Sequence, residues 1–278
     1  MDFFAHLAGD MAGIKASSPL VHHITNIVSA NFSANALLAL GASPLMSSSV
    51  EENADLLQIA GSLVLNTGTV DAAQLDAMCD AAALYSEALR PWVLDPVGAG
   101  STRLRTAAAI RIIRDGGAPT VIRGNAAEII SLAQGMGLLT DAPDIAPCGI
   151  DSCTGSSVAA GPATVLSRAC GSVVCVSGGT DYVTDGGCLV KIEGGSPLMA
   201  RVTGMGCVAT SIIGAFLTVD ENPLSAACCA MAVVSAAGQK AASRCKGPGS
   251  FVPEFLDALY GLETSYVIDN IGVDYEEL

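Results

Sequence analysis

The residues best suited to do chemistry form the run Thr203-Gly204-Met205-Gly206-Cys207, which precedes an uncharged, helix-like stretch at 208–219. The two glycines let backbone approach a ligand without an intervening Cβ. A turn that opens a helix leaves unpaired N–H groups, and the helix dipole favours an anion there. Cys207 falls in the first turn, where this field is expected to lower the pKa of its thiol. The run therefore predicts an anion cradle beside a titratable group, as in phosphate chemistry; an ordinary strand-to-helix turn with a buried cysteine is the alternative.

Three other strand ends carry polar residues of the kinds that phosphoryl transfer uses. Asp95 and Arg123 each follow an apolar run, Glu128 comes shortly after Arg123, and Ser177 precedes two glycines. Ligands of parallel α/β sheets collect beyond the carboxyl ends of the strands, so these side chains should meet. Carboxylates for Mg²⁺, a cation for phosphate oxygens and amide dipoles together suit phosphoryl transfer. Each residue alone has a structural alternative (turn opener, helix-terminus charge, ion-pair partner or loop residue), and their joint occurrence favours a site.

The elements that must position these residues indicate a doubly wound α/β fold. Short apolar runs without polar alternation are interleaved with helical patterns, as in a mostly parallel sheet covered on both faces. The predicted strands are 20–24, 43–46, 62–65, 92–94, 119–122 and 172–176, and the predicted helices between them are 29–40, 51–59, 72–89, 102–114 and 126–133.

The pattern changes in the last third of the chain. A hairpin with a Gly-Gly turn is predicted at 181–185 and 188–192, followed by helices at 208–219, 225–242 and 253–262. Residues 135–156 are expected to form an irregular surface loop, and the last residues, with Asp274, Glu276 and Glu277, a solvated tail. Because no repeat or low-complexity linker interrupts the chain, the sequence predicts one domain over residues 1–278.

Composition restricts the partners and the compartment. The 278 residues carry a formal net charge of −14, which argues against nucleic acid or an anionic membrane as partner. The ten cysteines, several of them in apolar runs, suit a reducing compartment, and no signal peptide is evident, so a cytoplasmic location is expected. Two uncharged stretches, 202–219 and 222–239, are nearly long enough to span a bilayer. Their small and weakly polar residues favour a buried pair of helices instead.

Ordered sequence blocks extend along most of the chain: 19–26 (PLVHHITN), 31–35 (NFSAN), 40–46 (LGASPLM), 66–69 (NTGT), 95–100 (DPVGAG), 123–128 (RGNAAE), 203–207 (TGMGC) and 246–251 (KGPGSF). In these blocks the chain resembles the hydroxyethylthiazole kinase family, the thiamine-pathway branch of the ribokinase-like superfamily. The resemblance implies a ribokinase-like fold and transfer of the ATP γ-phosphoryl group, with Mg²⁺, to the hydroxyl of 4-methyl-5-(2-hydroxyethyl)thiazole. It also implies a homotrimer with the thiazole pocket between neighbouring subunits.

The resemblance assigns the nucleotide and metal side of the site. The family pattern Asn-x-x-Glu falls on Asn125 and Glu128, which implies that they organise Mg²⁺ and phosphate with Asp95 nearby. Arg123 and Ser177 fall on nucleotide-contacting positions. The family often has Thr where this chain has Ser177, which is a mild departure.

The resemblance also assigns the acceptor side. Asn26, Met46 and Gly204 fall on thiazole-binding positions, and the thioether of Met46 suits contact with a flat sulfur-containing ring, with core filler as its alternative. Many ribokinase-like kinases have Asp, which accepts the substrate proton, where this chain and the thiazole kinase branch have Cys207. We therefore expect Cys207 to orient or deprotonate the alcohol, while amides of the turn that contains Gly204 and Gly206 stabilise charge on the phosphoryl group.

Two other interpretations stay open. One is a kinase of this fold for another small alcohol, such as a hydroxymethylpyrimidine, or an ATP-dependent hydrate dehydratase; the blocks around Asn26 and Met46 favour the thiazole. The other is a non-catalytic nucleotide-binding regulator, against which the complete set of Asp95, Arg123 and Glu128 argues. A dehydrogenase is disfavoured because no G-x-G-x-x-G follows an early strand.

Overall fold

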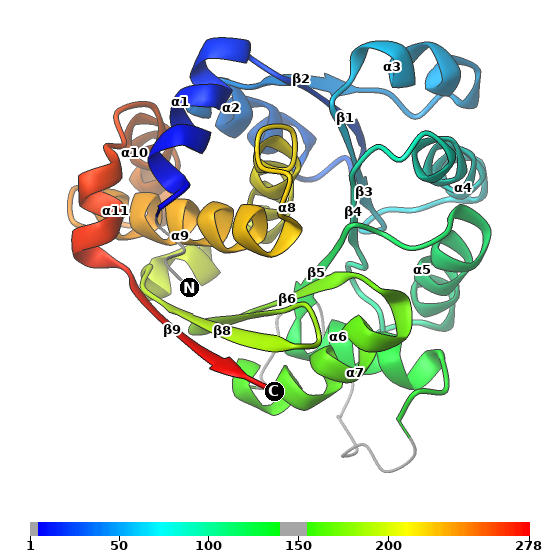
Figure 1. Ribbon diagram of the computed structural model, residues 1–278. Helices are drawn as coiled ribbons and strands as arrows, with labels where there is room; N and C mark the ends of the chain where they lie inside the picture. The colour runs from blue at the N-terminus through cyan, green and yellow to red at the C-terminus, as the bar shows by residue number, and fades with distance from the viewer. Residues whose placement is uncertain (1–4, 140–154) are drawn as a thin grey trace.

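The computed structural model describes residues 5–139 and 155–278, which form a nine-stranded sheet between two layers of helices (Figure 1). The strand order is β2-β1-β3-β4-β5-β6-β7-β8-β9. Six strands are parallel: β1 (Leu20–Ile24), β2 (Ser43–Met46), β3 (Ser62–Asn66), β4 (Trp92–Asp95), β5 (Val121–Asn125) and β6 (Val173–Ser177). The last three are antiparallel: β7 (Thr180–Thr184), β8 (Cys188–Glu193) and β9 (Gly272–Glu277). The predicted α/β fold with a mostly parallel sheet is confirmed.

The helices divide between the two faces of the sheet (Figure 1). One face is covered by α3 (Asn53–Ile59), α4 (Ala72–Glu87), α5 (Arg103–Gly116), α6 (Ala126–Gly135) and α7 (Ala160–Cys170). The other is covered by α1 (Leu7–Ser17), α2 (Ala30–Leu40), α8 (Met205–Phe216), α9 (Pro223–Ala242), α10 (Pro248–Tyr260) and α11 (Thr264–Asn270). Short 3₁₀ turns lie at Val50–Glu52, Ser156–Ala159 and Pro197–Arg201. Because both faces are covered, strand residues of either orientation are buried, which explains the apolar runs without alternation.

Helix α8 is the central element of the second layer. Ten of its 12 residues are buried, and Ser62 on β3 donates a 2.7 Å hydrogen bond to the backbone oxygen of Gly214. A Cβ at Gly214 would lie 2.7 Å from Val64 Cγ2, so the absence of a side chain lets α8 lie directly on the sheet. The hydrophobic core therefore holds α8, whose first turn contains the candidate anion cradle.

Helix α9 shows whether the long apolar stretch at 222–239 is a membrane span or a buried helix. Within residues 5–139 and 155–278 it is the one helix long and apolar enough to cross a membrane, and 89% of its most apolar window is buried inside the protein. Its apolar surface packs against α8, α10 and the sheet. The prediction of a buried pair of helices is confirmed.

The structure also differs from the sequence predictions. Three helices, α1, α7 and α11, were not predicted from the sequence. In α7, Gly161 and Pro162 resemble a loop, but they lie in the first turn of the helix, where proline is tolerated. Helix α10 begins at Pro248 rather than at the predicted residue 253, because here too a proline occupies the first turn of the helix. The predicted solvated tail is exposed but ordered, since β9 pairs with β8 as a charged edge strand. Of the predicted loop at 135–156, Gly135 still belongs to α6 and residues 140–154 lie outside the described residues.

Candidate active site

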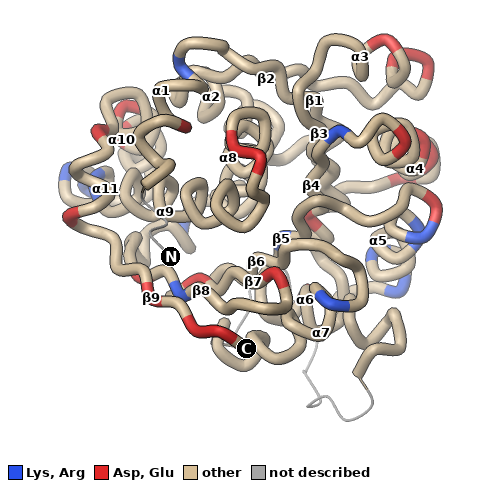
Figure 2. Tube along the Cα trace, viewed as in Figure 1, with Lys and Arg blue, Asp and Glu red and all other residues tan. Residues whose placement is uncertain are grey.

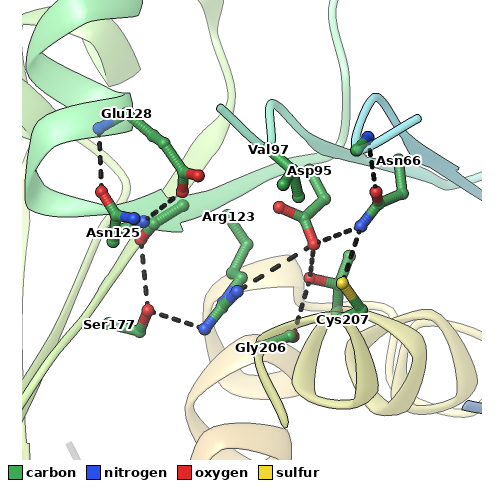
Figure 3. A network of polar contacts seen from close by, with 12 residues as sticks. Asn66, Asp95, Val97, Arg123, Asn125, Glu128, Ser177, Gly206 and Cys207 are labelled. Atoms are coloured by element: carbon green, nitrogen blue, oxygen red, sulfur yellow. Dashed lines mark hydrogen bonds and ion pairs between the residues drawn. The ribbon is translucent and has the colours of Figure 1, made fainter. Parts of the chain in front are cut away.

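The carboxyl ends of the parallel strands bring most of the predicted site residues to one edge of the sheet. Asp95 ends β4, Asn125 ends β5 and Ser177 ends β6, while Arg123 projects from β5. Figure 3 shows Asp95 and Arg123 next to the first turn of α8, with Ser177, Asn125 and Glu128 on the other side of Arg123. Asn26 follows β1 closely and bonds to Cys207. Met46 ends the edge strand β2 and is 37% exposed.

The two glycines of the opening turn are required for different reasons. Gly204 caps α8 with φ = 87°, a left-handed conformation that other residues rarely adopt. A Cβ at Gly206 would lie 2.7 Å from Nη1 of Arg123. The guanidinium of Arg123 therefore lies across the first turn of α8, in the space that a side chain at position 206 would fill. Cation, helix N-terminus and free backbone N–H groups thus face the same region.

Arg123 is buried without full compensation of its charge. It is 7% exposed, its Nη2 donates to Ser177 Oγ at 2.6 Å, and its Nη1 lies 4.0 Å from Asp95 Oδ2. Its Nε has no hydrogen-bond partner among the described residues. The chain has 13 Lys and Arg against 27 Asp and Glu, and Figure 2 shows acidic positions spread over α3, α4 and β9. A buried arginine in such an acidic chain is a local attractor for an anion.

Asp95 is a fully buried carboxylate, and one of its two oxygens has no hydrogen-bond partner among the described residues. Its Oδ2 accepts hydrogen bonds from Asn66 Nδ2 (2.8 Å) and Thr210 Oγ1 (2.7 Å). Its Oδ1 is also buried and has no partner in the part of the chain that the structure describes. Burial raises the pKa of Asp95, although Arg123 and the two hydrogen bonds oppose the shift. An unpartnered buried carboxylate oxygen is a fitting ligand for a cation.

Glu128 lies in the first turn of α6 and is held by backbone. Its Oε1 accepts from the N–H of Gly98 and its Oε2 from the N–H of Asn125, both at 2.8 Å, and Asn125 caps the helix in return. Burial, and then the nearby carboxylate of Asp95, raise the pKa of Glu128 to about 7. Positive charge between these two carboxylates would relieve that cost.

The two carboxylates of Asp95 and Glu128 fit Mg²⁺ better than they fit a metal ion that takes all its ligands from the protein. Among the described residues no group of three or more His, Cys, Asp and Glu could hold a metal ion. Mg²⁺ commonly uses one or two carboxylates and completes its shell with waters and substrate phosphates. Asp95 and Glu128, each with lone pairs still available, match that requirement.

Cys207 contradicts one prediction. Its pKa is raised rather than lowered, first by burial and then by the carboxylate of Asp95. Its Sγ accepts hydrogen bonds from Asn26 Nδ2 (3.3 Å) and Asn66 Nδ2 (3.2 Å). Hydrogen bonding with Ser29 and Asn26 and the charge of Arg123 lower the pKa, but they do not outweigh the desolvation of a charged sulfur. Cys207 is therefore a neutral thiol at physiological pH.

Asn66 and Thr210 take part in this network without having been predicted as site residues. Asn66 ends β3 as Asp95 ends β4, and Thr210 lies one helical turn after Gly206. The position of Asn66 at a strand end, within one of the ordered blocks, was a usable signal. Thr210 gave none, because a threonine inside an apolar helix is ordinary.

The fold is that of the ribokinase-like kinases. The fold is shared with the pyridoxal kinase of Staphylococcus aureus, which is 14% identical with a TM-score of 0.65 over 94% of this chain and all (100%) of that one. The sequence model of the Hydroxyethylthiazole kinase family matches residues 11–265, and the chain belongs to that family.

Individual relatives agree with this membership. A hydroxyethylthiazole kinase of Granulibacter bethesdensis is 46% identical over 256 residues, which cover 92% of this chain and 90% of the relative. The structure of a hydroxyethylthiazole kinase protein from Pyrococcus horikoshii OT3 is 34% identical, with a TM-score of 0.88 over 98% of this chain and 100% of that chain. The family predicted from the sequence blocks is confirmed.

Proposed function

We propose that this chain, acting as a single domain, phosphorylates the hydroxyl of 4-methyl-5-(2-hydroxyethyl)thiazole with ATP and Mg²⁺. The observation that carries the proposal is the undercompensated guanidinium of Arg123 across the first turn of α8, with Asp95 and Cys207 beside it. The family to which the chain belongs supplies the identity of the acceptor.

The nucleotide phosphates bind between β5, β6 and α8 in this proposal. Arg123 and Ser177 contact the phosphate oxygens, and Asn125 and Glu128 organise the turn that faces them. Backbone N–H groups of the first turn of α8 hold the transferred phosphoryl group. Asp95 and Glu128 would hold Mg²⁺, whose positive charge would offset the charge of the nucleotide phosphates.

The transfer itself asks little of a base. The hydroxyl oxygen forms a bond to the γ-phosphorus while the bond from that phosphorus to the bridging oxygen breaks, and ADP leaves with the bridging oxygen. In a loose transition state the hydroxyl proton is lost late, so it ends on the product phosphate or in solvent. The neutral thiol of Cys207 orients the hydroxyl oxygen, and positioning with electrostatics lowers most of the barrier.

Apolar side chains at and next to the acceptor residues Asn26 and Met46 are exposed. Ile27 and Val28, next to Asn26, are 83% and 60% exposed, and Met46 and Val50 are 37% and 51% exposed. Exposed apolar side chains beside a substrate site suit burial against a second copy of the chain. We therefore place the thiazole between Asn26 and Met46 of one subunit and the surface of its neighbour, in a homotrimer. Light scattering after gel filtration should give three times 27.9 kDa; a fully active monomer would refute the shared pocket.

The free cysteines support a cytoplasmic location for the protein. The cysteines that the structure describes form no disulfide with one another, and several lie in the core. A reducing compartment keeps them so. Labelling of cell fractions with an antibody to this chain tests the location, and recovery in an oxidising compartment would contradict it.

The decisive assay mixes the protein with hydroxyethylthiazole, ATP and Mg²⁺ and measures the mass of the product. We expect the thiazole monophosphate and stoichiometric ADP. Hydroxymethylpyrimidine and pyridoxal, as competing acceptors, should react much more slowly. Saturable ATP binding without phosphorylation of any acceptor would favour the non-catalytic regulator instead.

A further inference from the structure

Asn66 lies at the carboxyl end of β3, between the side chains of Asp95 and Cys207 (Figure 3). It is 1% exposed, and its Nδ2 donates to Asp95 Oδ2 at 2.8 Å and to Cys207 Sγ at 3.2 Å. A side-chain amide has two hydrogens, and each of these has one acceptor. One amide group thus links the carboxylate and the thiol of the candidate site.

Backbone groups fix the orientation of this amide. Asn66 Oδ1 accepts from the N–H of Gly68 at 3.0 Å and from Asn26 Nδ2 at 2.8 Å. Asn26 Oδ1 in turn accepts from the N–H of Ser29 at 2.9 Å. A backbone N–H can only donate, so neither amide can be flipped without losing a hydrogen bond. Both amides must therefore direct their N–H groups onward into the site.

The fixed amides determine what Cys207 can do. Its sulfur receives one N–H from Asn26 and one from Asn66, so two acceptor directions of the thiol are taken. Both hydrogens of each amide are committed, and both amide oxygens already accept from other groups. The S–H is therefore the group of the thiol that neither amide engages. The hydroxyl of Ser29 is a further polar neighbour of the sulfur, and the substrate hydroxyl would compete with it for this S–H.

We propose that Asn66 is a positioning residue for the phosphoryl transfer: it leaves the S–H of Cys207 for the substrate hydroxyl oxygen and the Oδ1 of Asp95 for the cation. The inference rests on the proposed kinase function. Asn66 touches neither reactant; it acts by holding both Cys207 and Asp95 in one rigid arrangement. Losing it should lower kcat more than it raises the KM for either substrate.

The principal variant is Asn66→Asp, which keeps an oxygen for Gly68 and Asn26 but replaces the amide donors by a carboxyl group. We expect kcat to fall on the order of 100-fold, the size expected when reacting groups are misplaced by about 1 Å. Thr210→Val is the matched control, because it removes the other donor to Asp95 Oδ2 and leaves the Cys207 contacts intact. It should cost about tenfold or less, as for one hydrogen bond.

A double-mutant cycle separates positioning from general damage. If Asn66 acts largely through the thiol, adding Asn66→Ala to Cys207→Ala should cost much less than Asn66→Ala costs alone. Losses that multiply would show that Asn66 does not act through Cys207, and would overturn the proposal. So would an Asn66→Asp enzyme whose kcat stays within about threefold of wild type, the scale of sub-kcal/mol effects.

A spectroscopic test needs no Asn66 variant and so survives a variant that fails to fold. The infrared spectrum of the wild type minus that of Cys207→Ala isolates one S–H stretching band among those of the ten cysteines. We expect this band to move to lower frequency when hydroxyethylthiazole binds, because the substrate hydroxyl oxygen is a stronger acceptor than the hydroxyl of Ser29 in its free-enzyme position. A band already at the lower frequency without the alcohol, and unmoved by it, would overturn the proposal. Absence of wild-type phosphorylation would instead refute the kinase function, so the two failures are distinct.

Discussion

Gly206→Ala should reduce catalysis while leaving stability almost unchanged. The new Cβ would lie 2.7 Å from Arg123 Nη1, roughly 0.7 Å short of an ordinary contact of 3.4 Å. The buried guanidinium must move by about that distance, and its 2.6 Å hydrogen bond to Ser177 must lengthen or break. Since a displacement of about 1 Å in an active site can cost on the order of 100-fold, we expect kcat/KM for ATP to fall about 10- to 100-fold.

The free energy of unfolding of the same variant should change little, because the helix propensity of alanine offsets part of the cost of the displaced Arg123–Ser177 hydrogen bond. Alanine is favoured over glycine inside a helix by up to about 1 kcal/mol, and position 206 is helical without a left-handed backbone. Urea denaturation should therefore give a free energy of unfolding within about 1 kcal/mol of wild type.

Gly214→Ala is the matched control, the same substitution two turns further along α8. Its Cβ would lie 2.7 Å from Val64 Cγ2 in the core, so it should lose about 1–3 kcal/mol of stability and keep the kcat of the folded enzyme. Initial rates at varied ATP measure both variants. If Gly206→Ala retained wild-type kcat/KM while Arg123→Ala were inactive, the reasoning that position 206 must stay empty for Arg123 would be refuted.

Three further predictions concern other parts of the molecule. Cys207→Ala should keep a measurable kcat, on the order of 10- to 100-fold below wild type. Glu128→Ala should lower kcat at least about 1000-fold, because it removes a carboxylate of the proposed cation site. Equal losses of kcat in the coupled assay would refute the orienting role of the thiol. Burial and the nearby Asp220 raise the pKa of Asp10 from 3.8 to about 6, so ionising Asp10 destabilises the fold at higher pH. Asp10→Asn should thus add roughly 1 kcal/mol at pH 8, a gain that grows from the lower pKa to the higher one and vanishes below both; a pH-independent effect in urea titrations would contradict this. Asn222→Ala removes the cap that accepts from two N–H groups of α9, and should lower the free energy of unfolding by about 1 kcal/mol without changing kcat; an unchanged urea midpoint would show that the cap contributes nothing.

The sequence predicted the sheet well because its parallel strands are covered on both faces. The runs 63–65 and 173–176 are apolar at every consecutive position, and only a strand that is covered on both faces requires that. The strand ends were predictable for the same reason, since Asp95 and Arg123 interrupt or end such runs. Family resemblance added the roles of Asn26 and Met46, which no periodicity indicates.

What the sequence left unpredicted depends on contacts between distant segments. The pKa of Cys207 follows from its burial beside Asp95, 112 positions away in the sequence, and a helix dipole argument does not include that contact. The need for glycine at 206 arises from Arg123 on another element. Asn66 is neither charged nor nucleophilic, so its place at a strand end in an ordered block is its one signal in the sequence, and its hydrogen bonds to two site residues become visible only in the fold.

The burial of α8 has a consequence for how the protein loses function on heating. The first turn of a helix at a domain surface can fray by itself, but α8 lies within the core on the sheet and beneath α9. The hydrogen-bonded amides of α8, which begin at Val208, should consequently exchange with solvent only through opening of the whole fold. Inactivation and cooperative unfolding should then share one midpoint temperature, and the phosphate cradle should survive as long as the domain does.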